Sequence, residues 1–249
     1  MLARFISTDI SDPRENFALE ESIFRLLEKP VFRVWSNGTS VIIGRAQLAR
    51  VETDMEYLTK ERIPVVRRFT AGGAVFNGPG NLNWSIFVPA RESGGINLGH
   101  DARRVFEGTA DIVTKALSRC GVDSRFDPPN RIWNGDGKIS GMAAYLSRDG
   151  VLCHGTLLTH ADLDFVRRVT TPVDVELDRK YVRSNPSPMT NCGARRGEFE
   201  AAVRTELSEL GFDLEASQLR DGEEKLKREL LSNKYLDDSW NLGDPFARN

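Results

Sequence analysis

The feature that most constrains the fold is the stretch of residues 67–85, in which strand-like runs alternate with short links of small residues. Such a pattern favours β-strands that follow one another closely, and the segment after the glycines continues as a strand rather than a helix. A β-type run over 63–66 leads into the pair Arg67-Arg68, which is followed by a small-residue loop with Gly72-Gly73. A second β-type run over 74–76, a Gly-Pro-Gly turn over 78–80 and a strand-like run over 82–88 complete the stretch.

This stretch has the composition of an anion-binding loop. Glycine lets the backbone approach a ligand and leaves N–H groups free to face an anion. Two arginines at the lip can fork onto a phosphate or a carboxylate. A tight β-turn beside two surface arginines is the alternative, and Gly72-Gly73 taken alone favours it. A P-loop is excluded, because no Gly-Lys-Ser/Thr follows the glycines.

Length and composition are those of an ordinary globular chain, with one domain over residues 1–249. The 249 residues are 40% hydrophobic and 28% charged, and the net charge is −2. This balance does not point to nucleic acid or to a membrane surface, and no apolar run is long enough to span a bilayer. Without a signal peptide or a cysteine framework, we expect a reduced, cytoplasmic protein. Three histidines make a histidine-rich metal site unexpected.

The remaining pattern predicts helices and hairpins in mixed order. Asn37-Gly38 predicts a hairpin of strands 31–35 and 40–43, and Asp149-Gly150 predicts one of strands 138–146 and 151–159. The order indicates an α+β fold with mixed, largely antiparallel sheets flanked by helices. Helices are expected over 14–27, 54–61, 101–120, 161–169, 197–210 and, mostly exposed, 221–232, with loops over 97–100, 126–130 and 171–197.

The string over 67–85 resembles the lipoate-attachment motif of the biotin/lipoate A/B protein ligase family, of the lipoate–protein ligase A type. The chain departs from that motif at Ala71, Asn77 and Gly78, where the family usually has Gly, His and Asp. Similar strings over 16–21, 41–47 and 240–241 extend the resemblance over nearly the whole chain, which implies a class II biotin/lipoate ligase-like catalytic domain. The matching motif residues are Arg67, Arg68, Thr70, Gly72, Gly73, Ala74, Val75, Phe76, Gly80, Asn81, Leu82, Asn83 and Ser85.

A second anchor is Lys138, which follows glycines at the start of a predicted strand. From composition alone, it is a surface lysine of a hairpin. The string over 138–143 resembles the family's second motif, in which the lysine contacts both the lipoyl carboxyl and the nucleotide phosphate. The resemblance therefore implies a catalytic role for Lys138, with Ser140, Gly141 and Ala143 in the same binding motif.

A third anchor, the string over 153–158, resembles the family's His-Gly-Thr-Leu-Leu motif and implies ligand contacts for His154, Gly155 and Thr156. If the turn at Asp149-Gly150 holds the register, His154 lies next to Lys138 across the hairpin. A buried structural histidine that bonds backbone is the alternative.

Cys153 precedes this motif, and it opens a second class of chemistry. A cysteine nucleophile would make the chain an acyltransferase that works through a thioester. A strand cysteine without a nearby base is more often inert packing. In the related octanoyltransferases the cysteine lies in the loop before the lysine motif, and the corresponding loop over 124–129 has none. The resemblance thus favours a ligase.

The turn-rich segment over 171–197 resembles the family's loop that closes over the adenylate. Lys180, Arg183, Thr190 and Asn191 match that loop, and its basic character fits a mobile lid over an anion. A surface loop with incidental basic residues is the alternative.

Two departures bear on the cofactors that the resemblance implies. The family usually has Asn-Asp before the lysine motif, where it helps to hold nucleotide and Mg²⁺, whereas this chain has Asn130-Arg131. Arginine removes a hard oxygen ligand and adds a positive charge, so the residues that would hold Mg²⁺ stay open. The small accessory domain of longer family members is also expected to be absent.

The resemblance implies a lipoate–protein ligase. Lipoate and ATP would give lipoyl-AMP, and the lipoyl group would pass to a lysine of a lipoyl-domain (E2-type) or glycine-cleavage H-like carrier protein. Arg68 and the glycine loop would hold the carboxyl end, and Val75 and Phe76 would line a slot for the aliphatic tail. The alternatives are a lipoyl or octanoyl transferase with a preformed donor, an enzyme that needs a separate accessory subunit for adenylation, and a non-catalytic lipoate-binding module.

Overall fold

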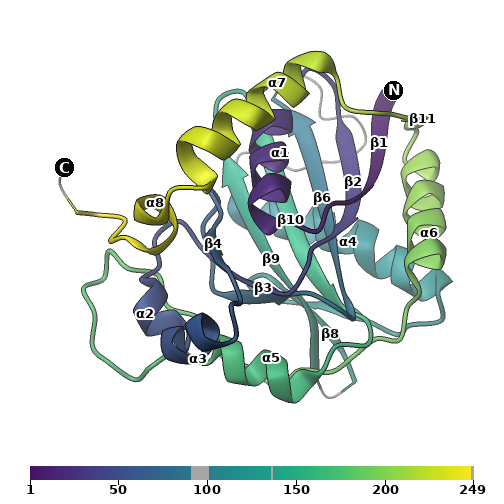
Figure 1. The fold of residues 1–249 in the computed structure, drawn as a ribbon. Helices are drawn as coiled ribbons and strands as arrows, with labels where there is room; N and C mark the ends of the chain where they lie inside the picture. Colours follow the sequence, from purple (N-terminus) through teal and green to yellow (C-terminus); the bar gives the residue numbers. More distant parts are fainter. Residues whose placement is uncertain (91–100, 136, 248–249) are drawn as a thin grey trace.

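The computed structural model describes residues 1–90, 101–135 and 137–247, arranged as helices on both faces of a large sheet (Figure 1). The loop expected over 97–100 lies outside these residues. Among the described helices, none is long and apolar enough to cross a membrane.

The large sheet has eight strands, and most neighbours in it run antiparallel, as the sequence predicted. Only β11, β1 and β2 pair in parallel, at one edge. In spatial order the strands are β11 (Asp213–Ala216), β1 (Leu2–Asp9), β2 (Val31–Ser36), β6 (Asn81–Pro89), β10 (Gly150–Leu158), β9 (Gly137–Leu146), β8 (Arg131–Asn134) and β7 (Arg125–Asp127). The segment over 126–130 was expected to be a loop, but its first two residues belong to β7.

Helices cover both faces of this sheet. Successive side chains of a strand point to opposite faces, and its strands carry apolar side chains on both. In β6, Trp84 and Ile86 pack with α4 (Ala102–Arg119) and α6 (Arg196–Glu209), whereas Phe87 packs with α1 (Pro13–Arg25) on the other face. The predicted helices over 14–27, 101–120 and 197–210 therefore form, each with its apolar stripe buried.

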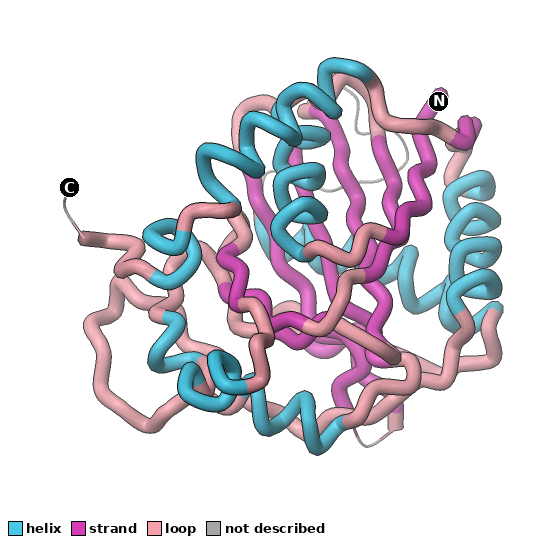
Figure 2. The backbone as a smooth tube through the Cα atoms, in the orientation of Figure 1, coloured by secondary structure: helices cyan, strands magenta, loops and turns pink. Residues whose placement is uncertain are grey.

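A three-stranded sheet lies beside the large one, in the order β4 (Val65–Arg67), β3 (Ser40–Ile43) and β5 (Val75–Asn77). The helix α5 (Leu163–Thr170) packs on it through Val166 and Val169. The short helices α2 (Ala49–Glu52) and α3 (Met55–Lys60) complete this part of the molecule (Figure 2).

The hairpin predicted at Asn37-Gly38 is wrong, although both of its strands form. β2 is hydrogen-bonded to β1 on one edge and to β6 on the other, so it has no edge left for β3. The chain instead passes at Asn37-Gly38 from the large sheet into the small one, where β3 pairs with β4 and β5.

The second predicted hairpin forms, but its register separates two expected neighbours. β9 and β10 pair with Val151 opposite Leu146, which places His154 opposite Ala143. Lys138 lies five positions further along β9 and bridges to Met189 instead, so the predicted cross-hairpin contact with His154 is wrong.

The helix predicted over 221–232 is not mostly exposed. α7 (Asp221–Leu230) packs along α1 and buries Glu223, whose carboxylate accepts a hydrogen bond of 2.8 Å from Arg4 in β1. A π-helical turn η1 (Leu231–Tyr235) and the helix α8 (Asp238–Leu242) then lead the chain back to β4.

We predict that Glu223→Ala lowers the free energy of unfolding by about 3 kcal/mol, because it leaves the buried Arg4 guanidinium without its counter-charge. Urea unfolding followed by circular dichroism measures this change. The matched control is Glu229→Ala, an exposed site on the same helix, with an expected change below about 0.5 kcal/mol. Equal effects of the two substitutions would contradict the predicted role of the pair.

Candidate active site

A cavity of about 620 Å³ lies where the two sheets meet α1, α5 and the loop between α5 and α6. It runs across the large sheet from Trp35 in β2 to Arg131 in β8. Of the residues singled out in the sequence, those that line it are Arg68, Gly72, Gly73, Ala74, Val75, Asn130, Lys138, Gly141, Ala143, His154, Gly155, Thr156 and Arg183.

Other predicted site residues do not line the cavity. Phe76 points into the apolar cluster beneath the small sheet, on the opposite side of β5 from Val75. The remaining residues of this group are Thr70, Ser140, Lys180, Thr190 and Asn191.

The glycine loop is held from within by Arg68. Its guanidinium is buried and donates to the carbonyl oxygens of Ala71 (2.7 Å) and Gly73 (2.8 Å) and to Thr70 Oγ1 (3.0 Å). Burial lowers the pKa of Arg68 to about 10, and the charge of Glu20 opposes that shift. Gly72 has a φ of +93°, a conformation that side-chain-bearing residues rarely adopt. Arg68 thus shapes the loop, in place of the exposed fork that the sequence predicted.

Arg67 is also buried, and it ties the C-terminal segment to this region. Its guanidinium donates to the carbonyl oxygens of Gln47 (2.6 Å), Trp240 (2.6 Å) and Gly243 (2.8 Å). The two arginines therefore do not stand at the lip of the cavity. Both guanidinium groups donate to backbone carbonyl oxygens, which carry only partial negative charge.

Lys138 differs from both arginines. Among the described residues its ammonium group has no ion-pair or hydrogen-bond partner, although it faces the cavity. Burial, and then the charge of Arg131, lower its pKa. Its backbone is fixed on both sides, because Lys138 N donates to Pro188 O (2.9 Å) and Lys138 O accepts from Thr190 N (3.1 Å). The geometry presents a rigidly placed, unpaired cation.

The described lining contains no carboxylate, and the lysine and arginines among its residues are basic. Arg131 pairs outside it with Asp127 at 2.8 Å, and its Nε, buried, has no hydrogen-bond partner. Asn130 is fixed by a hydrogen bond from its Nδ2 to Met142 O (2.7 Å). Within the described part of the chain, no three His, Cys, Asp or Glu residues gather as metal ligands. The described lining therefore offers no carboxylate, the protein group that most often holds Mg²⁺.

The opposite end of the cavity is apolar. Phe17 and Trp35 meet edge to face there, with ring centroids 5.5 Å apart, and Val75 lies on the same cavity wall. Sequence reasoning missed several of these contributors, although the string over 16–21 that carried the resemblance contains one of them. The missed lining residues of the whole cavity include Phe17, Trp35, Ile42, Met142 and Arg167.

His154 joins the cavity wall to a buried carboxylate. Its Nδ1 lies 2.8 Å from Glu20 Oε2, and Ser85 Oγ donates to Glu20 Oε1 (2.6 Å). Burial raises the pKa of Glu20, but His154, Ser85 and Arg33 together more than offset burial and lower it. Glu20 is a fully buried carboxylate, which the residue pattern alone did not single out.

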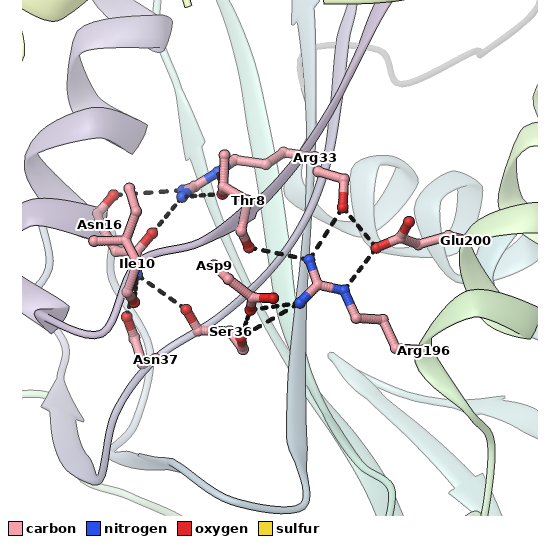
Figure 3. Close-up of polar contacts among 10 residues, drawn as sticks. Thr8, Asp9, Ile10, Asn16, Arg33, Ser36, Asn37, Arg196 and Glu200 are labelled. Atoms are coloured by element: carbon pink, nitrogen blue, oxygen red, sulfur yellow. Dashed lines mark hydrogen bonds and ion pairs between the residues drawn. The ribbon is translucent and has the colours of Figure 1, made fainter. Parts of the chain in front are cut away.

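A polar network fixes α1, the helix that carries Phe17 and Glu20 to the cavity (Figure 3). The side-chain amide of Asn16 donates to the carbonyl oxygens of Ile10 (2.7 Å) and Ser36 (3.0 Å). Arg33, buried beside it, donates to Asn16 and to Thr8 Oγ1. On the far side of β1, Arg196 of α6 bonds to Thr8 O at 3.1 Å, so both helix layers brace this strand.

The loop between α5 and α6 covers the cavity and is fastened by Glu52. This buried carboxylate accepts hydrogen bonds from Arg183 Nε (2.9 Å), Ser184 N (2.9 Å) and Gln47 Nε2 (2.8 Å). Ser184 Oγ in turn accepts from Ala74 N in the glycine loop (2.8 Å). We use the name Glu52 clasp for these contacts of Glu52, Gln47, Arg183 and Ser184.

The predicted ligand-binding residues of this loop contact the protein itself. Arg183 also donates to the carbonyl oxygens of Val173 and Val175, so its guanidinium organises the loop. Asn191 makes two hydrogen bonds of 2.9 Å with the backbone of Ala161 and anchors the loop's far end. Lys180 lies outside the cavity, 5.1 Å from the ring of Tyr181.

Cys153 is unsuited to nucleophilic catalysis in this structure. Its side chain is fully buried on the α4 face of the sheet, and Thr109 Oγ1 lies 3.2 Å from its Sγ. Burial raises the pKa of the Cys153 thiol to about 12, so the thiol stays protonated at neutral pH.

Comparisons with known proteins agree on one family. The family model of the lipoyl protein ligase A/B catalytic domain matches residues 12–203. Lipoate-protein ligase A subunit 1 of Thermoplasma acidophilum is 31% identical over 248 residues, which cover 92% of each chain. The chain therefore belongs to the lipoate–protein ligase A type of the biotin/lipoate A/B ligase family.

Solved structures agree with this assignment and confirm the predicted α+β fold. A lipoate-protein ligase A bound with ATP superposes with a TM-score of 0.84 at 28% identity, covering 98% of this chain and 99% of that one. The bi-partite lipoate protein ligase of Thermoplasma acidophilum, studied with its E2 lipoyl domain, also has a TM-score of 0.84, at 27% identity, covering 100% of this chain and 98% of that one.

We predict that Glu52→Ala releases the loop over 171–195. Without the carboxylate, Arg183, Ser184 N and Gln47 lose a shared acceptor, so amide exchange in the loop should quicken by about tenfold or more. Hydrogen–deuterium exchange with mass spectrometry measures this rate. The control is Glu56→Ala, an exposed site in α3. Loop exchange that stays at the wild-type rate in Glu52→Ala would show that the clasp does not hold the loop.

Proposed function

We propose that the cavity binds lipoate with its tail at the Phe17–Trp35 end and its activated carboxyl beside Lys138. The observation that carries this placement is the unpaired Lys138 ammonium, which faces a cavity without a described carboxylate. The chain is a lipoate–protein ligase, and it uses ATP to activate lipoate before transfer.

Two displacements make up the reaction. A carboxylate oxygen of lipoate attacks the α-phosphorus of ATP, and pyrophosphate leaves with the electron pair of the broken P–O bond. The ε-amine of an acceptor lysine then attacks the lipoyl carbonyl. The C–O bond to AMP breaks, an amide forms, and the amine loses a proton.

Lys138 has a physical task in both steps. Negative charge grows on phosphate oxygens in the first step and on the carbonyl oxygen in the second. A fixed cation within reach of both positions stabilises each transition state more than the ground state. Both ring nitrogens of His154, which lines the cavity, are engaged by Glu20 and Thr70, so desolvation of the incoming lysine favours its neutral, nucleophilic form.

The glycine loop and the loop over 171–195 would then hold the adenylate between them. Gly72 and Gly73 of the first line the cavity, and the Glu52 clasp keeps the second in place over it. In this arrangement Arg68, Gly72 and Gly73 position the carboxyl end by way of the backbone. Lys180, Thr190 and Asn191 act on the loop itself.

The acceptor is proposed to be a lipoyl domain of the E2 type. A solved relative was studied together with its E2 lipoyl domain, which supports this acceptor; because that relative is bi-partite, an enzyme that needs a separate accessory subunit for adenylation is the alternative. An H-like carrier protein is a second acceptor of the same chemistry. Residues 1–249 would form a single catalytic domain.

We propose that Mg²⁺ reaches the site bound to the phosphates of ATP. The described cavity residues offer no carboxylate cage, whereas Mg²⁺ is commonly bound through substrate phosphates and water. Arg131 stands where the resemblance led us to expect an acidic residue, and it would contact the phosphates directly.

We predict that Lys138→Met lowers kcat/KM for lipoate by about 100-fold or more, because the substitution removes the cation that meets the developing charge. Pyrophosphate release and the intact mass of an apo lipoyl domain measure the two steps. Lys115→Met, at an exposed ion pair in α4, is the control and should change activity less than about twofold. Normal adenylation by Lys138→Met would overturn the assigned role.

A second experiment separates a complete ligase from a transferase. One tube holds the chain, lipoate, ATP, Mg²⁺ and an apo lipoyl domain, and the other holds preformed lipoyl-AMP in place of lipoate and ATP. We expect a lipoylated domain in both tubes. Product in the second tube alone would show that adenylation needs another subunit, and product in neither would contradict the proposed acyl group or acceptor.

A further inference from the structure

A chain of four side chains links a buried carboxylate to the glycine loop. Glu20, His154, Thr70 and Arg68 follow one another at separations of 2.8, 2.8 and 3.0 Å, and Thr70 and Glu20 are fully buried. We use the name Glu20 relay for this set. Only Arg68 and His154 of the four line the cavity.

The direction of each hydrogen bond in the relay follows from its ends. Ser85 Oγ donates to one oxygen of Glu20, and the nearby charge of Arg33 favours the ionised carboxylate, which only accepts, so His154 Nδ1 carries the proton that lies between it and Glu20. At the other end, a guanidinium only donates, so Thr70 Oγ1 accepts from Arg68 Nε.

These two ends determine the direction of the middle hydrogen bond, between Thr70 and His154. The Thr70 hydroxyl still has a proton to donate, and among the described residues the acceptor within reach is His154 Nε2. Nε2 can accept only if it carries no proton. All three hydrogen bonds are therefore made at once when His154 is neutral and protonated on Nδ1, whereas free imidazole can carry its proton on either nitrogen.

We propose that Glu20 is a positioning residue of this site: it holds His154 as the Nδ1–H tautomer, so that Nε2 accepts from Thr70 and fixes the start of the glycine loop. This inference rests on the proposed function, because the loop is where that proposal places the lipoyl carboxyl. Glu20 itself acts through His154, since it does not line the cavity.

The relay acts on the loop from two sides. Thr70 O accepts from Arg45 N (2.8 Å), while its side chain is held between Arg68 and His154. Arg68 in turn bonds to the carbonyl oxygens of Ala71 and Gly73. A loop prearranged in this way does not lose conformational freedom when it binds the ligand, so the relay should appear chiefly in the KM for lipoate.

Support for Glu20 comes from its own surroundings. Ser85 Oγ donates to its second oxygen, and Trp35 Nε1 donates to Ser85 Oγ at 2.8 Å. Ser85 and His154 thus each need an oxygen of Glu20. A glutamine offers one oxygen and one amide donor, so Glu20→Gln cannot satisfy both, although it matches glutamate in shape.

The test reads the tautomer of His154 by ¹⁵N-detected long-range NMR on the folded full chain. Three histidines give a simple spectrum, and variants of His100 and His160 assign it. We expect the proton on Nδ1 in the wild type and on Nε2, at least in part, in Glu20→Gln. A wild-type proton on Nε2, or an imidazolium at neutral pH, would overturn the inference whether or not the chain lipoylates a carrier.

Kinetics provide the second readout. Glu20→Gln and Thr70→Val should each raise the KM for lipoate about tenfold with kcat nearly unchanged, and Thr70→Ser, which keeps the hydroxyl, should restore the wild-type value. The matched control is Glu21→Gln, an equally buried site on α1 that faces Tyr235 and Lys234, and it should leave the His154 tautomer unchanged. A shifted tautomer with an unchanged KM would contradict the positioning role.

Discussion

An unpaired positive charge held away from solvent is the constraint on which this site depends. Burying a cation without a counter-charge is unfavourable, and the described structure offsets that penalty for three arginines but not for Lys138. Arg68 is balanced by carbonyl oxygens, Arg183 by Glu52 and Arg4 by Glu223, whereas Lys138 faces open space and its pKa is lowered. In the proposed binding mode an anionic ligand completes this arrangement, and the charge that the fold leaves unbalanced would favour an acyl-adenylate.

The rest of the architecture serves to place that charge and shape the space around it. The register of β9 and β10 separates Lys138 from His154 along the cavity, so the cation and the buried Glu20 do not neutralise each other. The small sheet brings the glycine loop to the same wall, and the Glu52 clasp closes the other side. The two buried carboxylates, Glu20 and Glu52, therefore fix residues of the cavity wall although neither lines the cavity.

Much of the fold was predictable because local patterns decide it. The periodicity of α4 and the Asp149-Gly150 turn each carry their own signal, and both formed as expected. The Asn37-Gly38 hairpin failed because a turn dipeptide does not show whether the strand beside it already has two partners. That information resides in β1 and β6, which are remote in sequence.

The site was predictable in its residues more than in their roles. Most of the predicted site residues line the cavity, but the residue pattern placed Arg67 and Arg68 at an exposed lip. Whether an arginine meets a ligand or a backbone carbonyl depends on tertiary contacts, such as those of Arg67 with the C-terminal segment. Glu20 lies in the string over 16–21 and Glu52 lies outside the motifs, and neither was given a role because their partners are distant in sequence.

The most direct test of the central claim is a crystal structure with a non-hydrolysable lipoyl-adenylate analogue. The account predicts that Lys138 Nζ lies within hydrogen-bond distance of both the acyl carbonyl oxygen and the group that replaces the phosphate, with the lipoyl tail between Phe17 and Trp35. A complex in which Lys138 points to solvent and another cation takes both contacts would contradict it.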